Sequence, residues 1–383
     1  MSAPTPPAAD ANAAPATGSG PAVDRPIRAL LWRGPGAQLE IEPILLPAPG
    51  PKEVRVHIRA AGVCHSDLSM VNGTLAPPYP LVLGHEAAGV VTAAGPEASI
   101  AVGAHVVLNW APPCRRCWFC GNGQPWLCET AGAPTAARGA TADGEPLHVT
   151  LGLGALAEEV VVGDHAVIPV PAELPFATAA LLGCAVLTGV GAVRRTAGVR
   201  SGESAVVIGL GGVGLSTVMA ARAAGADPLI AVDVSDAKRE LALAAGATHF
   251  LVSGDDLSAQ VRGLTERRGA DHSFECVGRS ATIRAAWRAT RRGGQVTVVG
   301  MGAKDDMVSL AALDIFHSAR TLRSSVYGNS DPDRDVPALA HQVLDGGLDP
   351  AALITDRITL DESPEAFARM SRGEGARTVI LFP

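Results

Sequence analysis

Four cysteines lie close together in one short stretch of the chain, Cys114-x2-Cys117-x2-Cys120-x7-Cys128. Thiolates are good zinc ligands, and four of them complete a tetrahedral shell that leaves no position for water or substrate. Two other interpretations stay open at this point. The thiols could be buried without a ligand, or they could hold an iron–sulfur cluster, since some ferredoxin motifs begin with the same C-x2-C-x2-C spacing. The density of the four cysteines favours a closed, structural zinc site.

A second pattern is rich in glycine, because Gly209-Leu-Gly211-Gly212-Val-Gly214 matches G-x-G-x-x-G. In a chain with 43 glycines this match alone is weak, and a glycine turn without a ligand is the alternative. The context strengthens it, since a predicted strand precedes the motif and a predicted helix follows. Asp233 ends the next predicted strand, where its carboxylate could bind ribose hydroxyls. The motif therefore predicts a dinucleotide pyrophosphate at the start of a helix.

The residues around Asp233 also indicate which dinucleotide binds. A carboxylate at this position repels the additional phosphate of NADP, and the following Val234 and Ser235 supply no arginine to compensate. Lys238 is placed to help hold the adenosine ribose. The expected cofactor is NAD.

Two cysteines and one histidine stand apart from these motifs: Cys64 in Gly-Val-Cys-His-Ser-Asp, His85 in Leu-Gly-His-Glu, and Cys184 in Leu-Gly-Cys. Each of them alone could be an ordinary buried residue. Together with a dinucleotide motif, two cysteines and one histidine make up a three-ligand zinc shell whose fourth position stays open for a reactant. They are the candidate catalytic metal site.

The elements that must position these residues fall into two kinds. Between 27 and about 187, short Val- and Ile-rich runs alternate with Gly and Pro, which predicts mostly β structure. After Gly202, strand-then-helix units predict a parallel sheet covered by helices. The units have predicted strands at 204–208, 229–232, 270–274 and 295–299, with helices that end near 224 and 245.

The predicted fold class is α/β in two domains. A mostly-β, zinc-binding catalytic domain is expected at 27–187 and 329–383, because the last strand, 378–382, is expected to return to it. A doubly wound, parallel-sheet NAD domain is expected at 188–328. Residues 1–26 are rich in Ala and Pro and are expected to form a disordered tail.

Composition excludes several classes of function. Charged residues make up 18% of the chain and the formal net charge is −7, so nucleic acid is not an expected partner. No stretch reaches the roughly 18 apolar residues that a membrane span needs, and the first residues lack the basic start of a secretory signal. Four of the seven cysteines crowd together without an export signal, which favours a metal in a reducing compartment. The expected location is the cytoplasm.

These motifs resemble the zinc-dependent alcohol dehydrogenases of the medium-chain dehydrogenase/reductase family, over the range from about Ile27 to Pro383. The resemblance implies a GroES-like catalytic domain, a Rossmann NAD domain and two zinc ions per chain. It places Cys64, His85 and Cys184 on the catalytic zinc and the four-cysteine run on the structural zinc.

The resemblance also implies supporting residues. Asp67 would orient the imidazole of His85, and Glu86 would sit behind the metal. His65 would meet the pyrophosphate of NAD. The remaining positions that are similar to NAD contacts of the family are Thr188, Val213, Arg279, Val299 and Arg377.

The implied reaction is hydride transfer from a zinc-bound alkoxide to NAD. Ser66, two residues after Cys64, would accept the alcohol proton and pass it on through the NAD ribose. Many relatives end this relay with a histidine three residues after that serine, but this chain has Ser69 there. Serine is no base near pH 7, so water or His65 is expected to complete proton release. Trp110 is expected to line the alcohol pocket.

Within the family, several runs look most similar to the actinobacterial branch that oxidises the mycothiol–formaldehyde adduct and aryl alcohols. The runs are 107–110, 123–126, 151–154 and 324–327. Members that use a glutathione adduct carry a basic residue just after the last of the four clustered cysteines. Residues 129–133 of this chain contain no basic residue, which argues against glutathione as the thiol that carries the substrate.

Three functions are carried forward. The first is NAD-dependent oxidation of a primary or aromatic alcohol to the aldehyde. The second is oxidation of a hydroxymethyl–thiol adduct such as that of mycothiol, and the third is a catalytically silent, dinucleotide-binding sensor or structural protein. The small-molecule alcohol or aldehyde is the expected partner. A homodimer is also expected, because the chain keeps the long segment 129–149 typical of dimeric members, although shorter relatives are often tetramers.

Overall fold

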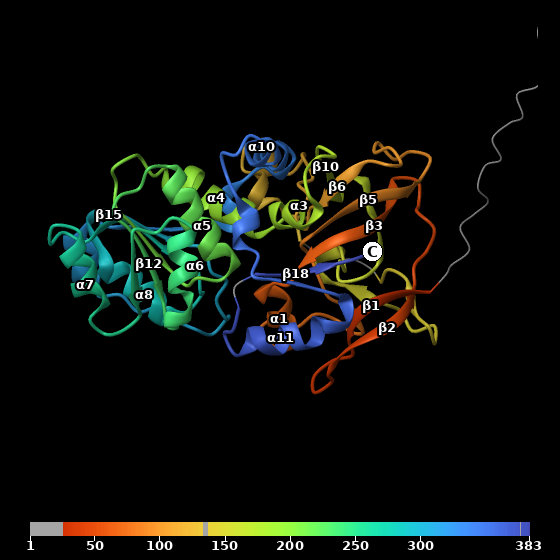
Figure 1. Ribbon diagram of the computed structural model, residues 1–383, viewed down its shortest axis with the longest axis horizontal. Coiled ribbons are helices and arrows are strands. Elements are labelled where there is room, and N and C mark those ends of the chain that lie inside the picture. Colours follow the sequence, from red (N-terminus) through yellow and green to blue (C-terminus); the bar gives the residue numbers. More distant parts are fainter. Residues whose placement is uncertain (1–25, 133–136, 376) are drawn as a thin grey trace, which may run out of the picture.

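The computed structural model describes residues 26–132, 137–375 and 377–383 of the chain. The predicted tail thus lies, apart from Pro26, outside the described residues. The molecule is elongated, with a β-rich half built mainly from the first part of the chain and an α/β half built from its middle (Figure 1). Helices α4 (Ala185–Gly191) and α10 (Pro332–Leu344) lie between the two halves.

The β-rich half contains two sheets and several short helices. Its elements up to residue 197 are β1 (Ile27–Trp32), β2 (Leu39–Leu45), β3 (Glu53–Gly62), α1 (His65–Val71), β4 (Leu81–Val82), β5 (Ala87–Ala94), β6 (His105–Leu108), α2 (Trp118–Gly121), η1 (Pro125–Leu127), β7 (Ala140–Thr141), β8 (His148–Val149), η2 (Thr150–Gly152), β9 (Glu159–Gly163), η3 (Asp164–Ala166), β10 (Val167–Pro169), α3 (Phe176–Leu182), α4 (Ala185–Gly191) and η4 (Ala192–Ala197). One sheet has the order β7-β2-β1-β4-β8, and the other has β10-β6-β5-β3-β18-β17 with β9 also paired to β3.

The α/β half is a six-stranded sheet with the order β13-β12-β11-β14-β15-β16, in which every neighbouring pair is parallel. Its elements are β11 (Ala205–Ile208), α5 (Gly212–Ala223), β12 (Leu229–Asp233), η5 (Asp236–Lys238), α6 (Arg239–Ala244), β13 (His249–Val252), α7 (Leu257–Leu264), β14 (Ala270–Glu275), α8 (Ser280–Ala289), β15 (Thr290–Val298), α9 (Ala312–Ser318) and β16 (Thr321–Ser324). The central strand β11 is buried along its whole length, as expected when helices cover both faces of a sheet.

This parallel sheet confirms the predicted fold class. The predicted bounds of its strands agree with the structure to within one residue, except that one strand begins five residues earlier. We expected a strand at 295–299, but β15 already begins at Thr290. Thr290 pairs with Ala270 before the register shifts between Ala270 and His272. The Arg-Arg-Gly-Gly stretch of β15 is polar, so the hydrophobic pattern of the sequence does not indicate this first part of the strand.

The end of the chain returns to the β-rich half. Its elements are η6 (Val326–Asn329), α10 (Pro332–Leu344), η7 (Pro350–Leu353), β17 (Asp356–Ile358), η8 (Leu360–Glu362), α11 (Ser363–Ser371) and β18 (Thr378–Leu381). Strand β18 runs antiparallel to β3, with Ile380 opposite Ala61. This pairing brings the residues just before β18 next to the loop that follows β3.

No single helix among the described residues has the length and apolar character of a membrane span. One bent pair, Phe176–Leu182 with Ala185–Ala197, meets those two criteria only when its members are taken together.

Candidate active site and metal centres

Three distant segments bring Cys64, His85 and Cys184 together, and we refer to these three residues as the buried group. Cys64 precedes helix α1, His85 follows strand β4, and Cys184 precedes helix α4. All three are less than a tenth exposed. Their ligand atoms and one carboxylate oxygen of Glu86 lie within 4.8 Å of one another. The structure therefore assembles the three ligands that were expected for the catalytic metal.

The imidazole of His85 is held from behind by Asp67. The Asp67 Oδ2 atom lies 3.1 Å from His85 Nδ1, and its Oδ1 atom accepts a hydrogen bond of 2.8 Å from the Gly84 amide. This arrangement directs His85 Nε2 toward the sulfurs, 3.5 Å from Cys184 Sγ. Burial opposes a charged imidazole, but the charges of Asp67 and Cys64 outweigh it and raise the pKa of His85 to about 10.

The two thiols of the buried group differ in their acidity. A hydrogen bond from the Cys184 thiol lowers the pKa of Cys64 well below its usual range, and the same contact, with burial, raises the pKa of Cys184. A thiolate, a second thiol and an oriented imidazole within one buried cluster are the donor set that zinc prefers. The residues therefore fit a zinc ion bound by two sulfurs and one nitrogen.

A buried arginine connects this group to the glycine-rich motif. Arg377 pairs through Nη2 with Glu86 and donates from Nη1 to the Val63 carbonyl at 3.2 Å. A Cβ atom added at Gly212 would lie 2.9 Å from Arg377 Nη1. Burial lowers the pKa of this guanidinium. Arg377 thus lies between the metal group and the start of α5, where the expected pyrophosphate would bind.

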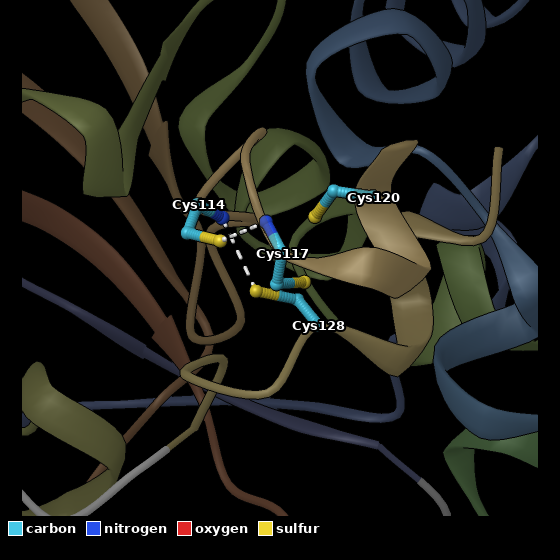
Figure 2. A group of neighbouring side chains, drawn as sticks. All are labelled: Cys114, Cys117, Cys120 and Cys128. Carbon is cyan, nitrogen blue, oxygen red and sulfur yellow. Dashed lines mark hydrogen bonds between the residues drawn. The ribbon is translucent and has the colours of Figure 1, made fainter. Parts of the chain in front are cut away.

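The four clustered cysteines form a separate site, which we call the cysteine lobe (residues 114–128). Figure 2 shows their sulfurs directed toward a common centre, and all four lie within 4.8 Å of one another. Four sulfurs around a zinc ion with bonds of about 2.3 Å would be about 3.8 Å apart, so the lobe fits a tetrahedral metal. The Cys114 amide donates to Cys128 Sγ at 3.2 Å and the Cys117 amide donates to Cys114 Sγ at 3.3 Å.

These backbone bonds favour thiolates in the lobe. Although burial raises it, the bonds from the Cys114 amide and from Thr130 lower the pKa of Cys128 to about 6. A thiol that is already deprotonated at neutral pH is ready to bind a metal. The geometry therefore supports the closed metal site that the spacing predicted.

The glycine-rich motif has the predicted strand–turn–helix form between β11 and α5. A Cβ atom at Gly214 would lie 1.8 Å from the Gly209 carbonyl oxygen, so only glycine permits this close turn. No atom of the described residues lies within 4 Å of a Cβ atom added at Gly211, which leaves the backbone open for a ligand. At the end of β12, Asp233 accepts hydrogen bonds from the amides of Leu210 and Ser235 at 2.8 and 3.0 Å.

The other residues expected to contact NAD are spread around this motif. His65 and Lys238 line one cavity, and burial lowers the pKa of both. Val213 lies in the first turn of α5, Thr188 is buried in α4, the exposed Arg279 precedes α8, and Val299 follows β15.

The residues of the expected proton relay lie at the start of α1. Cys64 Sγ is 3.8 Å from Ser66 Oγ, so this hydroxyl borders the buried group. The half-buried Ser69 donates to the His65 carbonyl at 3.0 Å and is thereby engaged with its own helix. This geometry places Ser66, and not Ser69, beside the metal group.

Trp110 lines a cavity of about 350 Å³, together with Asn109, Leu151 and Arg138 among others. None of the three buried-group residues is among the described residues that line this cavity. The Trp110 ring packs at 4.6 Å between ring centroids against Tyr327. Tyr327 and Asn109 were not predicted as site residues. The available signals were the rarity of tyrosine, which occurs twice in 383 residues, and the place of both residues in the runs 107–110 and 324–327 that resemble one branch of the family.

Two family models match the chain. The model described as alcohol dehydrogenase GroES-like domain matches residues 50–172, and the model described as zinc-binding dehydrogenase matches residues 212–344. The chain is 34% identical to the S-(hydroxymethyl)glutathione dehydrogenase of Paracoccus denitrificans, over 91% of this chain and 97% of that protein. It is 33% identical to the NDMA-dependent alcohol dehydrogenase of Amycolatopsis methanolica, over 92% and 98%. This chain belongs to the zinc-dependent alcohol dehydrogenase family.

Solved structures of the family have the same fold. A zinc-binding alcohol dehydrogenase domain protein from Burkholderia ambifaria has a TM-score of 0.88 at 34% identity and covers 94% of this chain and 100% of that one. The benzyl alcohol dehydrogenase of Acinetobacter calcoaceticus has a TM-score of 0.86 at 27% identity with the same coverage. Membership of this family makes the chain an oxidoreductase with zinc and NAD as its cofactors.

Proposed function

We propose that this chain oxidises a primary or aromatic alcohol to the aldehyde with NAD, reversibly, at the buried group. The observation that carries the proposal is the link between Cys64, His85 and Cys184 and the glycine-rich motif through Arg377. Hydride transfer requires the alcohol carbon and the nicotinamide to be in contact, and this link joins the two binding sites. Zinc, when bound by the three ligands, lowers the pKa of an alcohol hydroxyl.

The residues of the chain have distinct roles in this proposal. Asp67 fixes the ring of His85, and Glu86 balances the charge of Arg377 behind the metal ligands. Ser66 accepts the alcohol proton and passes it toward solvent, and bound NAD would supply a ribose hydroxyl for this path. With Ser69 bonded to the His65 carbonyl, water or the His65 ring completes the relay.

NAD is bound by the residues around α5 and β12. Gly209, Gly211, Gly212 and Gly214 receive the pyrophosphate at the start of the helix, as glycine-rich turns do in dinucleotide-binding folds. Asp233 and Lys238 hold the adenosine ribose, Arg377 neutralises phosphate charge, and His65 contacts the pyrophosphate. Thr188, Val213, Arg279 and Val299 complete the contacts. We place the catalytic domain at 27–187 and 329–383 and the NAD domain at 188–328.

The experiment follows NADH formation by the purified, zinc-assayed chain with benzyl alcohol and a series of short alkanols. Turnover of these alcohols without a thiol supports the proposal. The absence of turnover with every alcohol and adduct, in a chain that holds two zinc ions, would refute it and favour a dinucleotide-binding sensor.

A second candidate is oxidation of a hydroxymethyl–thiol adduct. It is favoured by the relative named S-(hydroxymethyl)glutathione dehydrogenase. The absence of a basic residue at 129–133 argues for a thiol other than glutathione, such as mycothiol. Formaldehyde is therefore assayed with mycothiol, with glutathione and with no thiol, and a further sample offers NDMA in place of NAD. Activity that requires a thiol would replace the first proposal by this one.

We further propose that the chain forms a homodimer through the edge of its parallel sheet. Strand β16 is the last strand in the sheet order and is exposed along its length. Helix α9 and β16 expose large apolar side chains, with Leu313 at 69%, Phe316 at 79% and Leu322 at 45%. Exposed apolar surface beside a free strand edge is suited to pairing with a second copy. Light scattering of the wild type and of Phe316→Glu tests this, with a monomer expected for the variant.

A cytoplasmic location is proposed from the thiols. All seven cysteines of the chain are free. Six of them lie in the two metal groups, and metal binding requires these thiols to be reduced. Fractionation of cells that produce the chain tests this proposal.

A further inference from the structure

The hydroxyl group of Tyr327 reaches the peptide unit directly before a metal ligand. It donates a hydrogen bond of 2.5 Å to the carbonyl oxygen of Gly183, the residue before Cys184. Asn109 Oδ1 lies 3.4 Å from the same hydroxyl. The side chain is fully enclosed, and burial raises the pKa of Tyr327 well above its usual range, so the hydroxyl keeps its proton and remains a donor. The position of Cys184 is thus fixed from outside the buried group.

The backbone of Tyr327 is held in an unfavourable conformation. Its φ of 50° and ψ of 36° lie in the left-handed region, which is unfavourable for a residue with a Cβ atom. The following Gly328 packs directly on α4, because a Cβ atom at Gly191 would lie 2.2 Å from the Gly328 carbonyl oxygen. A strained conformation persists only where neighbouring contacts impose it. These contacts hold the Tyr327 side chain in place.

The cysteine lobe holds the same segment from its other side. Arg115, between two residues of the lobe, donates to both carboxylate oxygens of Asp331 at 2.6 and 2.8 Å, and it also pairs with Asp333. The short helix η1 inside the lobe packs against η6, which contains Tyr327. Segment 326–333 is therefore held between the lobe and the buried group.

We propose that Tyr327 is a positioning residue through which the metal of the cysteine lobe sets the geometry of the buried group. A metal in the lobe fixes Arg115 and η1, these fix segment 326–333, and the Tyr327 hydroxyl then fixes the Gly183–Cys184 peptide unit. The ring of Tyr327, packed on Trp110, transmits the same constraint to a side chain expected in the alcohol pocket. The kinetic part of this proposal rests on the proposed alcohol oxidation.

The test compares Tyr327→Phe, which removes one hydroxyl and keeps the ring, with Tyr79→Phe. Tyr79 is the other tyrosine of the chain. It is 53% exposed, and its ring packs on Trp32. Each protein is charged with Co²⁺, and its thiolate-to-cobalt absorption is recorded as a difference from the wild type. We expect shifted bands and kcat/KM for benzyl alcohol lowered about tenfold in Tyr327→Phe, as for the loss of one buried hydrogen bond. Both variants are expected to keep two metal ions per chain.

A second variant tests the connection between the cysteine lobe and Tyr327. It remains informative even if Tyr327→Phe does not fold. Asp331→Asn weakens the pair with Arg115 but lies outside both metal groups. We expect it to shift the cobalt bands in the same direction, and the double variant Asp331→Asn/Tyr327→Phe to be no worse than Tyr327→Phe alone. Bands unchanged in Asp331→Asn, or effects that multiply in the double variant, would overturn the coupling.

The spectra and the kinetics separate two kinds of failure. If the wild type oxidises none of the alcohols, the proposed function fails, while the cobalt spectra still decide whether Tyr327 positions Cys184. If Tyr327→Phe has the spectrum and the KM of Tyr79→Phe, Tyr327 has no positioning role.

Discussion

The buried group and the cysteine lobe use the same kind of sulfur ligand but are assembled in opposite ways. The lobe takes four thiols from residues 114–128 and stabilises two of its sulfurs with backbone amides of the same loop. The buried group takes its ligands from positions 64, 85 and 184 and orients its imidazole with a carboxylate. A short segment can specify the first site by itself. The second exists only after the strands and helices around it have packed.

Opening the buried group should have the largest effect on activity. In Cys184→Ala we expect kcat to fall at least about 10³-fold, because the metal that activates the alcohol loses one of three ligands. Zinc content, measured by atomic emission, should fall from two ions per chain to one. A variant that kept two zinc ions and normal turnover would remove Cys184 from the metal site.

Ser66→Ala should separate proton transfer from metal binding within the same group. We expect turnover to fall by about 10²-fold or more, as is typical when a general acid–base group is removed, with both zinc ions and NAD affinity retained. The matched control is Ser69→Ala, since this hydroxyl bonds only to the His65 carbonyl among the described residues. Steady-state rates and NAD titration measure both. Equal turnover in the two variants would contradict the relay.

Opening the lobe should affect stability and, through Tyr327, catalysis. In Cys120→Ser we expect one zinc ion per chain, a Tm lower by roughly 5–10 °C and kcat/KM for benzyl alcohol lowered about tenfold, as in Tyr327→Phe. Thermal unfolding with parallel zinc analysis measures this. Loss of both zinc ions would show that the two sites do not assemble independently.

The seventh cysteine should behave as a member of neither group. Cys276 directly follows β14 and is half-buried, burial raises the pKa of its thiol, and its Sγ lies 3.9 Å from Thr217 Oγ1. In Cys276→Ala we expect two zinc ions, unchanged turnover and a free energy of unfolding lower by about 1 kcal/mol in urea. This variant is also the control for Cys184→Ala, and a change in its zinc content would weaken both comparisons.

The sequence predicts the parts of this molecule that depend on neighbouring residues. The four-cysteine spacing, the glycine-rich turn and the apolar strands before it are local patterns, and the parallel sheet confirms the fold that they indicated. The contact between Tyr327 and Gly183 joins positions 144 residues apart and leaves no local pattern. The same holds for Arg377, which family resemblance indicated as an NAD contact but whose pair with Glu86 no pattern in the sequence predicted. Contacts of this kind depend on tertiary packing, and one sequence does not show which distant residues meet.

The pairing of β18 with β3 has a consequence for synthesis of the chain. Arg377 and β18 are made long after their partners, Val63, Glu86 and β3. The α/β half can fold before they are made. The active site must wait, so a nascent chain leaves the end of β3 unpaired and Glu86 unneutralised until residues 377–381 have been made.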